Sequence, residues 1–109
     1  MNAVAPGDAR MPDAQPPTGD SVMRTFTICN KKGLHARASA KFVQTVEKFD
    51  AEVRVTRGHE TVGGNSIMGL MMLAAAPGTS ITVEARGREA AEVIEALANL
   101  IDSRFGEVD

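Results

Sequence analysis

Four short stretches of the chain alternate between apolar and polar residues, and this pattern predicts four β-strands. They are residues 24–30 (RTFTICN), 51–57 (AEVRVTR), 60–62 (ETV) and 80–86 (SITVEAR). In the first stretch, Phe26 and Ile28 share one face, while the alternate positions hold threonines and Cys29. Since successive side chains of a strand point to opposite faces, each stretch is expected to bury one face of a sheet.

Three other stretches repeat apolar residues at helical spacing, and they are expected to form amphipathic helices. They cover residues 37–49, 66–73 and about 88–105. The last helix is expected to bury a stripe made of Ala90, Val93, Ile94, Leu97 and Ile101. Asn65 or Ser66 is suited to cap the second helix, because a short polar side chain accepts hydrogen bonds from the amides of a first turn.

The order of these elements, β-α-β-β-α-β-α, predicts an α+β open-faced sandwich. We expect a four-stranded, mainly antiparallel sheet with three helices on one face. Residues 1–22 contain four of the five prolines and few large apolar side chains, so they are expected to form a disordered tail. The remaining residues, 23–109, are expected to form a single domain.

Composition narrows the possible partners. The formal net charge is −2, and the chain has no tryptophan or tyrosine, so a nucleic-acid partner is not expected. No apolar run approaches the ~20 residues of a membrane span, so membrane insertion is not expected either. The single cysteine, Cys29, cannot form an internal disulfide, and no ligand set has zinc spacing. We therefore expect a cytoplasmic monomer without a cofactor or metal.

The strongest candidate for chemistry is His35, in the stretch GLHARASA (residues 33–40). It lies just before the first predicted helix, where unpaired amides and the positive end of the helix dipole suit an anion, phosphate above all. Arg37 adds a planar cation whose donors match phosphate oxygens. A neutral imidazole is a usable nucleophile near pH 7, so attack on an activated phosphoryl group would give a phosphohistidine.

The surroundings of His35 are expected to be open. No acidic or bulky residue is near it in the sequence, and the small residues Ala36, Ala38, Ser39 and Ala40 would leave room for a docking partner.

Other roles for these side chains remain open at the level of the sequence. His35 could be a surface or capping residue. A nucleophilic pair of Cys29 and His35 lacks an orienting third group, and a metal site made with His59 lacks ligand spacing.

Two motifs resemble a known family. KKGLHARASAKF (residues 31–42) and NSIMGLMML (residues 65–73) resemble the active-site and regulatory-serine segments of HPr, the histidine-containing phosphocarrier family of the bacterial phosphoenolpyruvate-dependent phosphotransferase system. His35 and Ser66 lie 31 residues apart, the separation that the family shows. The resemblance covers roughly residues 23–105. It departs from the family pattern at Ala38, where a proline usually follows the arginine.

The resemblance implies a role for each matched residue. His35 would accept a phosphoryl group on Nδ1 from phosphorylated Enzyme I and pass it to an Enzyme IIA domain, while Arg37 would pair with the phosphate. Ser66 would be the regulatory phosphorylation site of an HPr kinase/phosphorylase. The partner-binding residues would be Ala40, Ile67, Met68 and Met71. Such a chain is a stoichiometric phosphoryl carrier rather than an independent catalyst.

The second helix carries six apolar side chains, and about half of them are expected to lie in the core. They are Ile67, Met68, Leu70, Met71, Met72 and Leu73. The remainder would form an exposed, pliable patch.

Two functional questions stay open. The closing segments are similar to the nitrogen-related branch of the family, so sugar uptake and nitrogen or carbon signalling are both possible pathways. A non-catalytic regulatory module of the same fold, acting through serine phosphorylation and partner binding, is the alternative function. The presence of both His35 and Arg37 argues against it.

Overall fold

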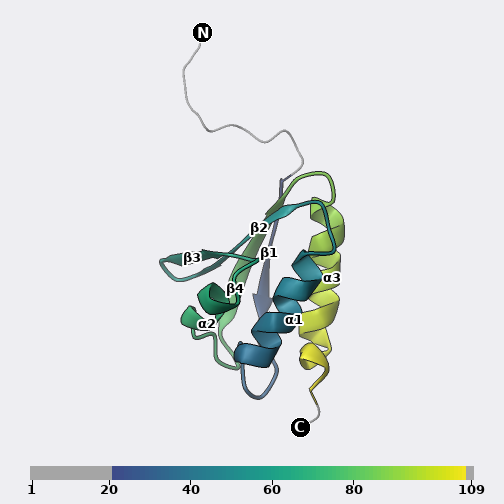
Figure 1. Ribbon diagram of the computed structural model, residues 1–109. Helices are drawn as coiled ribbons and strands as arrows, with labels where there is room; N and C mark the ends of the chain where they lie inside the picture. Colours follow the sequence, from purple (N-terminus) through teal and green to yellow (C-terminus); the bar gives the residue numbers. More distant parts are fainter. Residues whose placement is uncertain (1–20, 108–109) are drawn as a thin grey trace.

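The computed structural model describes residues 21–107, which fold into a sheet covered on one face by helices (Figure 1). The elements are β1 (Ser21–Thr27), α1 (Ala36–Val46), β2 (Glu52–Arg57), β3 (Glu60–Gly63), α2 (Ile67–Met72), β4 (Ser80–Arg86), α3 (Ala90–Asp102) and the 3-10 helix η1 (Arg104–Gly106). Their order confirms the predicted β-α-β-β-α-β-α arrangement.

The strands form one sheet in the order β1-β4-β2-β3, and every neighbouring pair is antiparallel. The helices lie on one side of this sheet, as predicted (Figure 1). The other side carries polar side chains, including a contact of 3.1 Å between the hydroxyls of Thr25 and Thr82. This difference between the two faces explains why the strands alternate in sequence.

The core lies between the sheet and the helices. Its largest buried side chains include Phe42 from α1, Leu97 from α3 and Phe105 from η1. They pack against buried strand residues such as Val55 and Val83. The segments around His35 and the end of α3 are thus attached to one continuous apolar layer.

The boundary of the first strand differs from the prediction. β1 begins at Ser21, so residues 21 and 22 pair with β4 and do not belong to the predicted tail. Residues 1–20, the rest of that predicted tail, lie outside the described residues. The strand ends at Thr27 rather than at residue 30, because Asn30 begins a turn in which the amide of Gly33 donates to its carbonyl.

The last helix is shorter than predicted. α3 ends at Asp102, and Arg104 and Phe105 adopt positive φ values of 57° and 56°. This left-handed backbone ends the helix and turns Phe105 into the core. The spacing of apolar residues alone could not indicate this break, because a continuous helix would also have placed Phe105 in the core.

None of the helices between residues 21 and 107 has both the length and the apolar character that crossing a membrane requires.

Candidate functional site

His35 lies at the start of α1, as its N-cap residue, with φ −76° and ψ −177°. Its carbonyl accepts the first helical hydrogen bond, from the amide of Ser39 at 2.8 Å. The amides of a first helical turn lack intrahelical acceptors and carry the positive end of the helix dipole. The imidazole is 28% exposed, so an accessible ring lies beside backbone groups that suit an anion.

The loop before His35 is fixed against the segment that follows α2. The amide of Leu34 donates to the carbonyl of Ala75 at 3.0 Å. Gly33 has a φ of +66°, and a Cβ placed on it would lie 2.3 Å from the same carbonyl oxygen. Only glycine therefore fits where the loop passes this segment.

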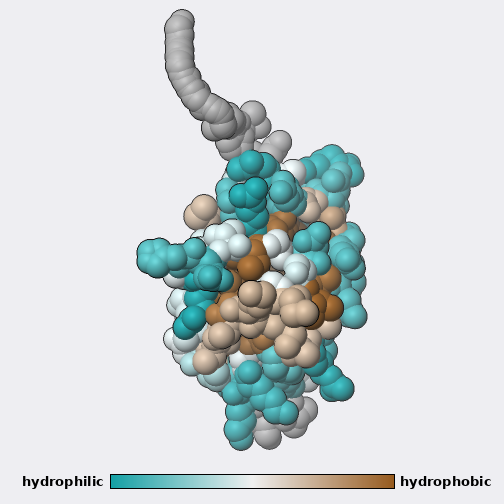
Figure 2. Space-filling view, turned by 60° about the vertical axis from the view of Figure 1, so that its left-hand side comes forward, coloured by the Kyte–Doolittle hydropathy of each residue, from teal (hydrophilic) through white to brown (hydrophobic). Residues whose placement is uncertain are grey.

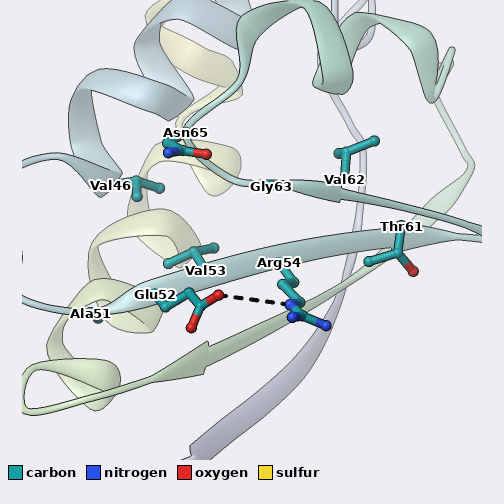
Figure 3. A pocket seen from close by; sticks show the side chains of 9 residues that line it. All are labelled: Val46, Ala51, Glu52, Val53, Arg54, Thr61, Val62, Gly63 and Asn65. Carbon is teal, nitrogen blue, oxygen red and sulfur yellow. Dashed lines mark ion pairs between the residues drawn. The ribbon is translucent and has the colours of Figure 1, made fainter.

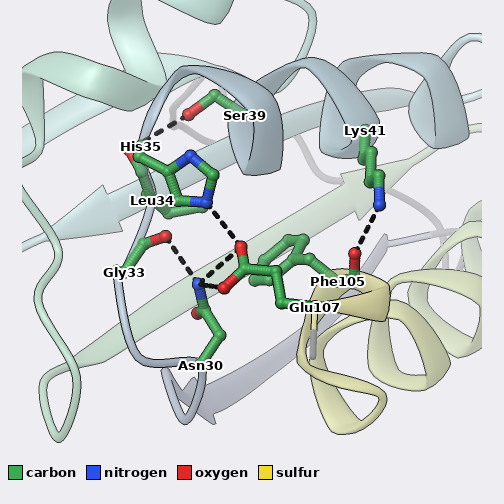
Figure 4. A network of polar contacts seen from close by, with 8 residues as sticks. All are labelled: Asn30, Gly33, Leu34, His35, Ser39, Lys41, Phe105 and Glu107. Carbon is green, nitrogen blue, oxygen red and sulfur yellow. Dashed lines mark hydrogen bonds and ion pairs between the residues drawn. The ribbon is translucent and has the colours of Figure 1, made fainter. Parts of the chain in front are cut away.

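The imidazole of His35 contacts an acidic side chain from the far end of the chain (Figure 4). Its Nε2 lies 2.5 Å from Oε2 of Glu107, a residue 72 positions away in sequence. The expectation that no acidic group lies at the site is thus wrong. The residues next to His35 in sequence did not indicate this contact, because Glu107 follows α3 and is brought to His35 by η1.

Asn30 completes this polar cluster. Its Nδ2 donates to both carboxylate oxygens of Glu107 at 3.2 Å and to the carbonyl of Gly33 at 2.8 Å. The side chain is fully buried and comes from the loop between β1 and α1. Asn30 does not stand out in the sequence, because its role depends on a partner that only the fold brings near.

Glu107 is ionised at neutral pH. The hydrogen bond with His35 is the main cause that holds the pKa of the Glu107 carboxyl below its ordinary value of 4.5. Burial opposes this effect, while donation from Asn30 and the positive charge of Lys32 reinforce it. Because an ionised carboxylate only accepts hydrogen bonds, Nε2 of the neutral imidazole must carry the proton in this contact.

A basic cleft of about 890 Å³ lies beside His35. It is lined by Lys31, Lys32, His35, Ala36, Arg37, Lys41, Gly106 and Glu107. The structure therefore places Arg37, which is exposed on α1, in the same cleft as His35. The ammonium of Lys41 donates to the carbonyl of Phe105 at 2.6 Å, which helps to keep the segment with Glu107 in place.

The small residues after His35 are less open than expected. Ala38 and Ser39 are buried, and the Ser39 hydroxyl donates to the carbonyl of Leu34 at 3.2 Å. Ala36 is exposed and Ala40 is half-buried. Ala38 and Ser39 face the core while Ala36 faces outward, because successive helical residues point about 100° apart around the axis.

α2 forms an exposed apolar patch, visible as the tan and brown area near the centre of Figure 2. We call Ile67, Met68, Met71 and Met72 the α2 patch. Only Leu70 and Leu73 of the six apolar residues are buried, fewer than the expected half, because one face of this six-residue helix contacts the core. The neighbouring helix α1 packs against α2, and Ala40 belongs to α1.

Ser66 is the N-cap of α2 and accepts a hydrogen bond from the amide of Gly69 at 2.9 Å. Its predicted capping role is therefore present in the structure. A shallow groove of about 210 Å³ runs from His35 to Ala74, Ala75 and Ala76, just beyond the same helix. The segment after α2 thus adjoins the surroundings of His35.

Two alternative sites were a nucleophilic pair of Cys29 and His35 and a metal site that includes His59, and the structure supports neither. The thiol of Cys29 donates to the carbonyl of Ile101 at 3.3 Å, and His59 is exposed in the turn between β2 and β3. No group of three or more His, Cys, Asp or Glu side chains within residues 21–107 could hold a metal ion.

A second pocket, of about 430 Å³, lies beside β2 and β3 (Figure 3). It includes none of the candidate site residues. Its two charged residues, Glu52 and Arg54, form an ion pair at 3.9 Å.

Fold and site together define a class: a small α+β domain with an accessible imidazole at a helix N-terminus, beside a basic cleft and an apolar helix. A family model described as "PTS HPr component phosphorylation site" matches residues 22–103. The chain belongs to this HPr family of phosphocarrier proteins of the phosphotransferase system.

Similar proteins include members with two different names. The phosphocarrier protein HPr of Neisseria meningitidis serogroup B is 55% identical over 84 residues, covering 77% of this chain and 94% of the relative. The phosphocarrier protein NPr of Shewanella violacea is 39% identical over 84 residues, covering 77% and 92%. The crystal structure of HPr-C-His from Thermoanaerobacter tengcongensis is 42% identical, with a TM-score of 0.77, and the match covers 81% of this chain and 99% of that one.

Proposed function

We propose that His35 accepts a phosphoryl group on Nδ1 from phosphorylated Enzyme I and passes it to an Enzyme IIA domain. The observation that carries this proposal is the contact between His35 Nε2 and Glu107 at the start of α1. This contact occupies Nε2 of the imidazole, so Nδ1 is the ring nitrogen that remains available as the nucleophile. Arg37 and the first-turn amides of α1 offset the charge of the incoming phosphoryl group.

The partners would dock on the surface that surrounds His35. Within the α2 patch, Ile67, Met68 and Met71 offer exposed apolar area, and the half-buried Ala40 lies on α1, which packs against α2. Methionine side chains adapt to differently shaped surfaces, which suits a carrier that meets a donor and an acceptor in turn. A carrier also has to release each partner quickly, so these interfaces are expected to be small.

The proposal is tested by incubating the protein with phosphoenolpyruvate and Enzyme I. Wild type should gain a label that is acid-labile and base-stable, and His35→Ala should gain none while keeping its fold. The matched control is His59→Ala, which removes the other histidine and should be labelled like wild type. An unlabelled wild type would instead favour the non-catalytic binding module.

Ser66 is proposed as a regulatory phosphorylation site for an HPr kinase/phosphorylase. Its hydroxyl lies at the N-terminus of α2, next to the α2 patch. A phosphate there would add negative charge beside the docking surface and slow transfer. A kinase assay should label wild type and the control Ser103→Ala, but not Ser66→Ala; equal labelling of all three would exclude Ser66.

The pathway is testable through the acceptor. Similar proteins carry the names HPr and NPr, so sugar uptake and nitrogen-related signalling both remain within the proposal. Transfer rates to a sugar-specific and a nitrogen-related Enzyme IIA, measured side by side, would identify the pathway. We further propose that the carrier acts as a cytoplasmic monomer; its single cysteine, Cys29, is a free thiol.

A further inference from the structure

Three side chains from two distant parts of the chain form a continuous hydrogen-bonded series (Figure 4). His35 contacts Glu107 through Nε2, and Asn30 donates to both oxygens of the same carboxylate. His35 and Glu107 have side chains that are 28% and 17% exposed, and Asn30 is fully buried. In such partly desolvated surroundings, a hydrogen bond to a charged group is stronger than in water.

We propose that Glu107 and Asn30 are positioning residues for phosphoryl transfer through His35. Glu107 keeps the proton of the neutral imidazole on Nε2, so that Nδ1 presents its lone pair, and it stabilises the cationic ring that forms on phosphorylation. Asn30 holds the carboxylate in place. This inference rests on the proposed function and adds a role for two residues that the sequence motifs do not contain.

The transfer step balances without loss of a proton. The lone pair of His35 Nδ1 forms the new N–P bond, and the bond between phosphorus and the donor's leaving atom breaks with its electron pair returning to the donor. The His35 ring then carries the phosphoryl group on Nδ1, the original proton on Nε2 and a positive charge. Glu107 faces that charge directly, at the 2.5 Å contact. Onward transfer returns the electron pair to Nδ1 and restores the neutral ring.

The orientation of the Asn30 amide supports its part in this arrangement. Its Nδ2 has acceptors on Glu107 and Gly33, whereas its Oδ1 is buried without a hydrogen-bond partner among the described residues. Turning the amide over would direct oxygen at the carboxylate and lose all three contacts. A buried amide that leaves its own oxygen unpaired is oriented by its donor side, and here that side faces Glu107.

The other charged groups around the ring are basic, and one of them, Lys32, helps to hold the pKa of the Glu107 carboxyl below its ordinary value. Lys31, Lys32, Arg37 and Lys41 line the same cleft, and Glu107 is the only acidic residue among its lining residues. Replacing Glu107 by glutamine therefore removes the carboxylate that contacts His35 and leaves the cations of the cleft in place.

The first test compares Glu107→Gln with wild type in single-turnover transfer from phosphorylated Enzyme I. The proposal predicts a rate at saturating donor that is lower by about 10- to 100-fold, the range for a hydrogen bond to a charged group. The half-saturating donor concentration should stay unchanged, because Glu107 acts on the ring and not on docking. Glu95→Gln is the matched control: it removes an exposed carboxylate that pairs with Arg24 at 3.0 Å, and it should transfer like wild type.

The second test measures the imidazole tautomer of His35 directly by ¹⁵N NMR, without any donor. Wild type should show the proton on Nε2, and Glu107→Ala should show a mixture of the two tautomers. Asn30→Ala should move the tautomer ratio in the same direction but less far, and NMR of its amides reports whether it folds. An unchanged tautomer in Glu107→Ala, or wild-type transfer by Glu107→Gln, would overturn the inference.

Failure of the inference differs from failure of the proposed function. If His35 is not the phosphoryl acceptor, either wild type gains no label or His35→Ala is labelled like wild type. If only the positioning role is wrong, wild type is labelled and Glu107→Gln transfers equally fast.

Discussion

Gly33 is the single residue on which the backbone path into His35 depends most directly. Its φ is +66°, and any Cβ at this position would approach the Ala75 carbonyl oxygen to 2.3 Å, so there is no room for a side chain. Gly58 has a similar φ of +62° but nothing within 4 Å of such a Cβ. A comparison of alanine variants at the two glycines therefore distinguishes the cost of backbone strain, present at both, from that of steric overlap, present only at Gly33.

We predict that Gly33→Ala costs clearly more stability than Gly58→Ala. Left-handed backbone alone costs alanine about 1–2 kcal/mol, and this term applies to both variants. Gly33→Ala must also displace the Ala75 carbonyl, which accepts from Leu34, so we expect at least about twice the loss. Urea unfolding of both variants measures the difference, and equal losses would contradict the steric argument.

Glu107 gives a prediction about acid pH. Its pKa in the folded protein lies below 4.5, so folding favours the ionised carboxylate. The resulting stability is present above pH 4.5 and is lost as the pH falls through the folded-state pKa. Glu107→Gln should thus be less stable than wild type at neutral pH, and the two unfolding free energies should converge in acid. A gap that stays constant with pH would contradict this linkage.

At this scale, the sequence led to His35, Arg37 and Ser66 through local motifs, and the structure places His35 and Arg37 in one cleft. Glu107 and Asn30 could not be found in the same way. Their contact with each other joins positions 77 residues apart, and only the completed fold brings such positions together.

Among the elements, α2 depends most on its first residue. It has six residues, and its only buried residue is Leu70, so little packing holds it in place. The hydroxyl of Ser66 supplies a cap through the amide of Gly69. Short helices gain a large share of their stability from such caps.

We predict that Ser66→Ala lowers the unfolding free energy by about 1 kcal/mol and exposes the Gly69 amide to faster hydrogen exchange. Ser103→Ala, which removes a hydroxyl that donates to the Leu100 carbonyl at 2.8 Å, is the comparison. It should leave the exchange of Gly69 unchanged. Slow exchange of Gly69 in Ser66→Ala would show that packing alone holds the helix.

The sequence predicted which elements form better than where they end. The spacing of apolar residues identified the four strands and the helices α1, α2 and α3, because one face of each meets the core, but it did not indicate η1. The ends follow from local backbone conformation instead. The positive φ of Arg104, for example, ends the last helix, and neither its charge nor its neighbours in sequence indicated that value.

Over the whole molecule, the core and the site are joined through Phe105. This side chain is fully buried, and its carbonyl accepts from Lys41 of α1 at 2.6 Å. Glu107 follows two residues later, so the position of its carboxylate depends on how Phe105 is anchored.

We predict that Phe105→Ala lowers the unfolding free energy by about 3–5 kcal/mol and also slows phosphoryl transfer in the folded protein. Leu97→Ala is the control, because it removes an equally buried side chain from the middle of α3. It should cost about 2–5 kcal/mol and transfer normally where it is folded. Equal transfer by both variants would mean that the anchor does not serve the site.

The late position of Glu107 in the chain has a consequence for biosynthesis. His35 leaves the ribosome early, whereas the carboxylate that contacts it is translated after every strand and helix of residues 21–107. A nascent polypeptide that still holds Glu107 in the exit tunnel would present the imidazole without its acidic neighbour. On the positioning role inferred above, such a nascent chain would be a poor substrate for the donor, and it would become competent only after the segment that follows α3 has emerged and folded against α1.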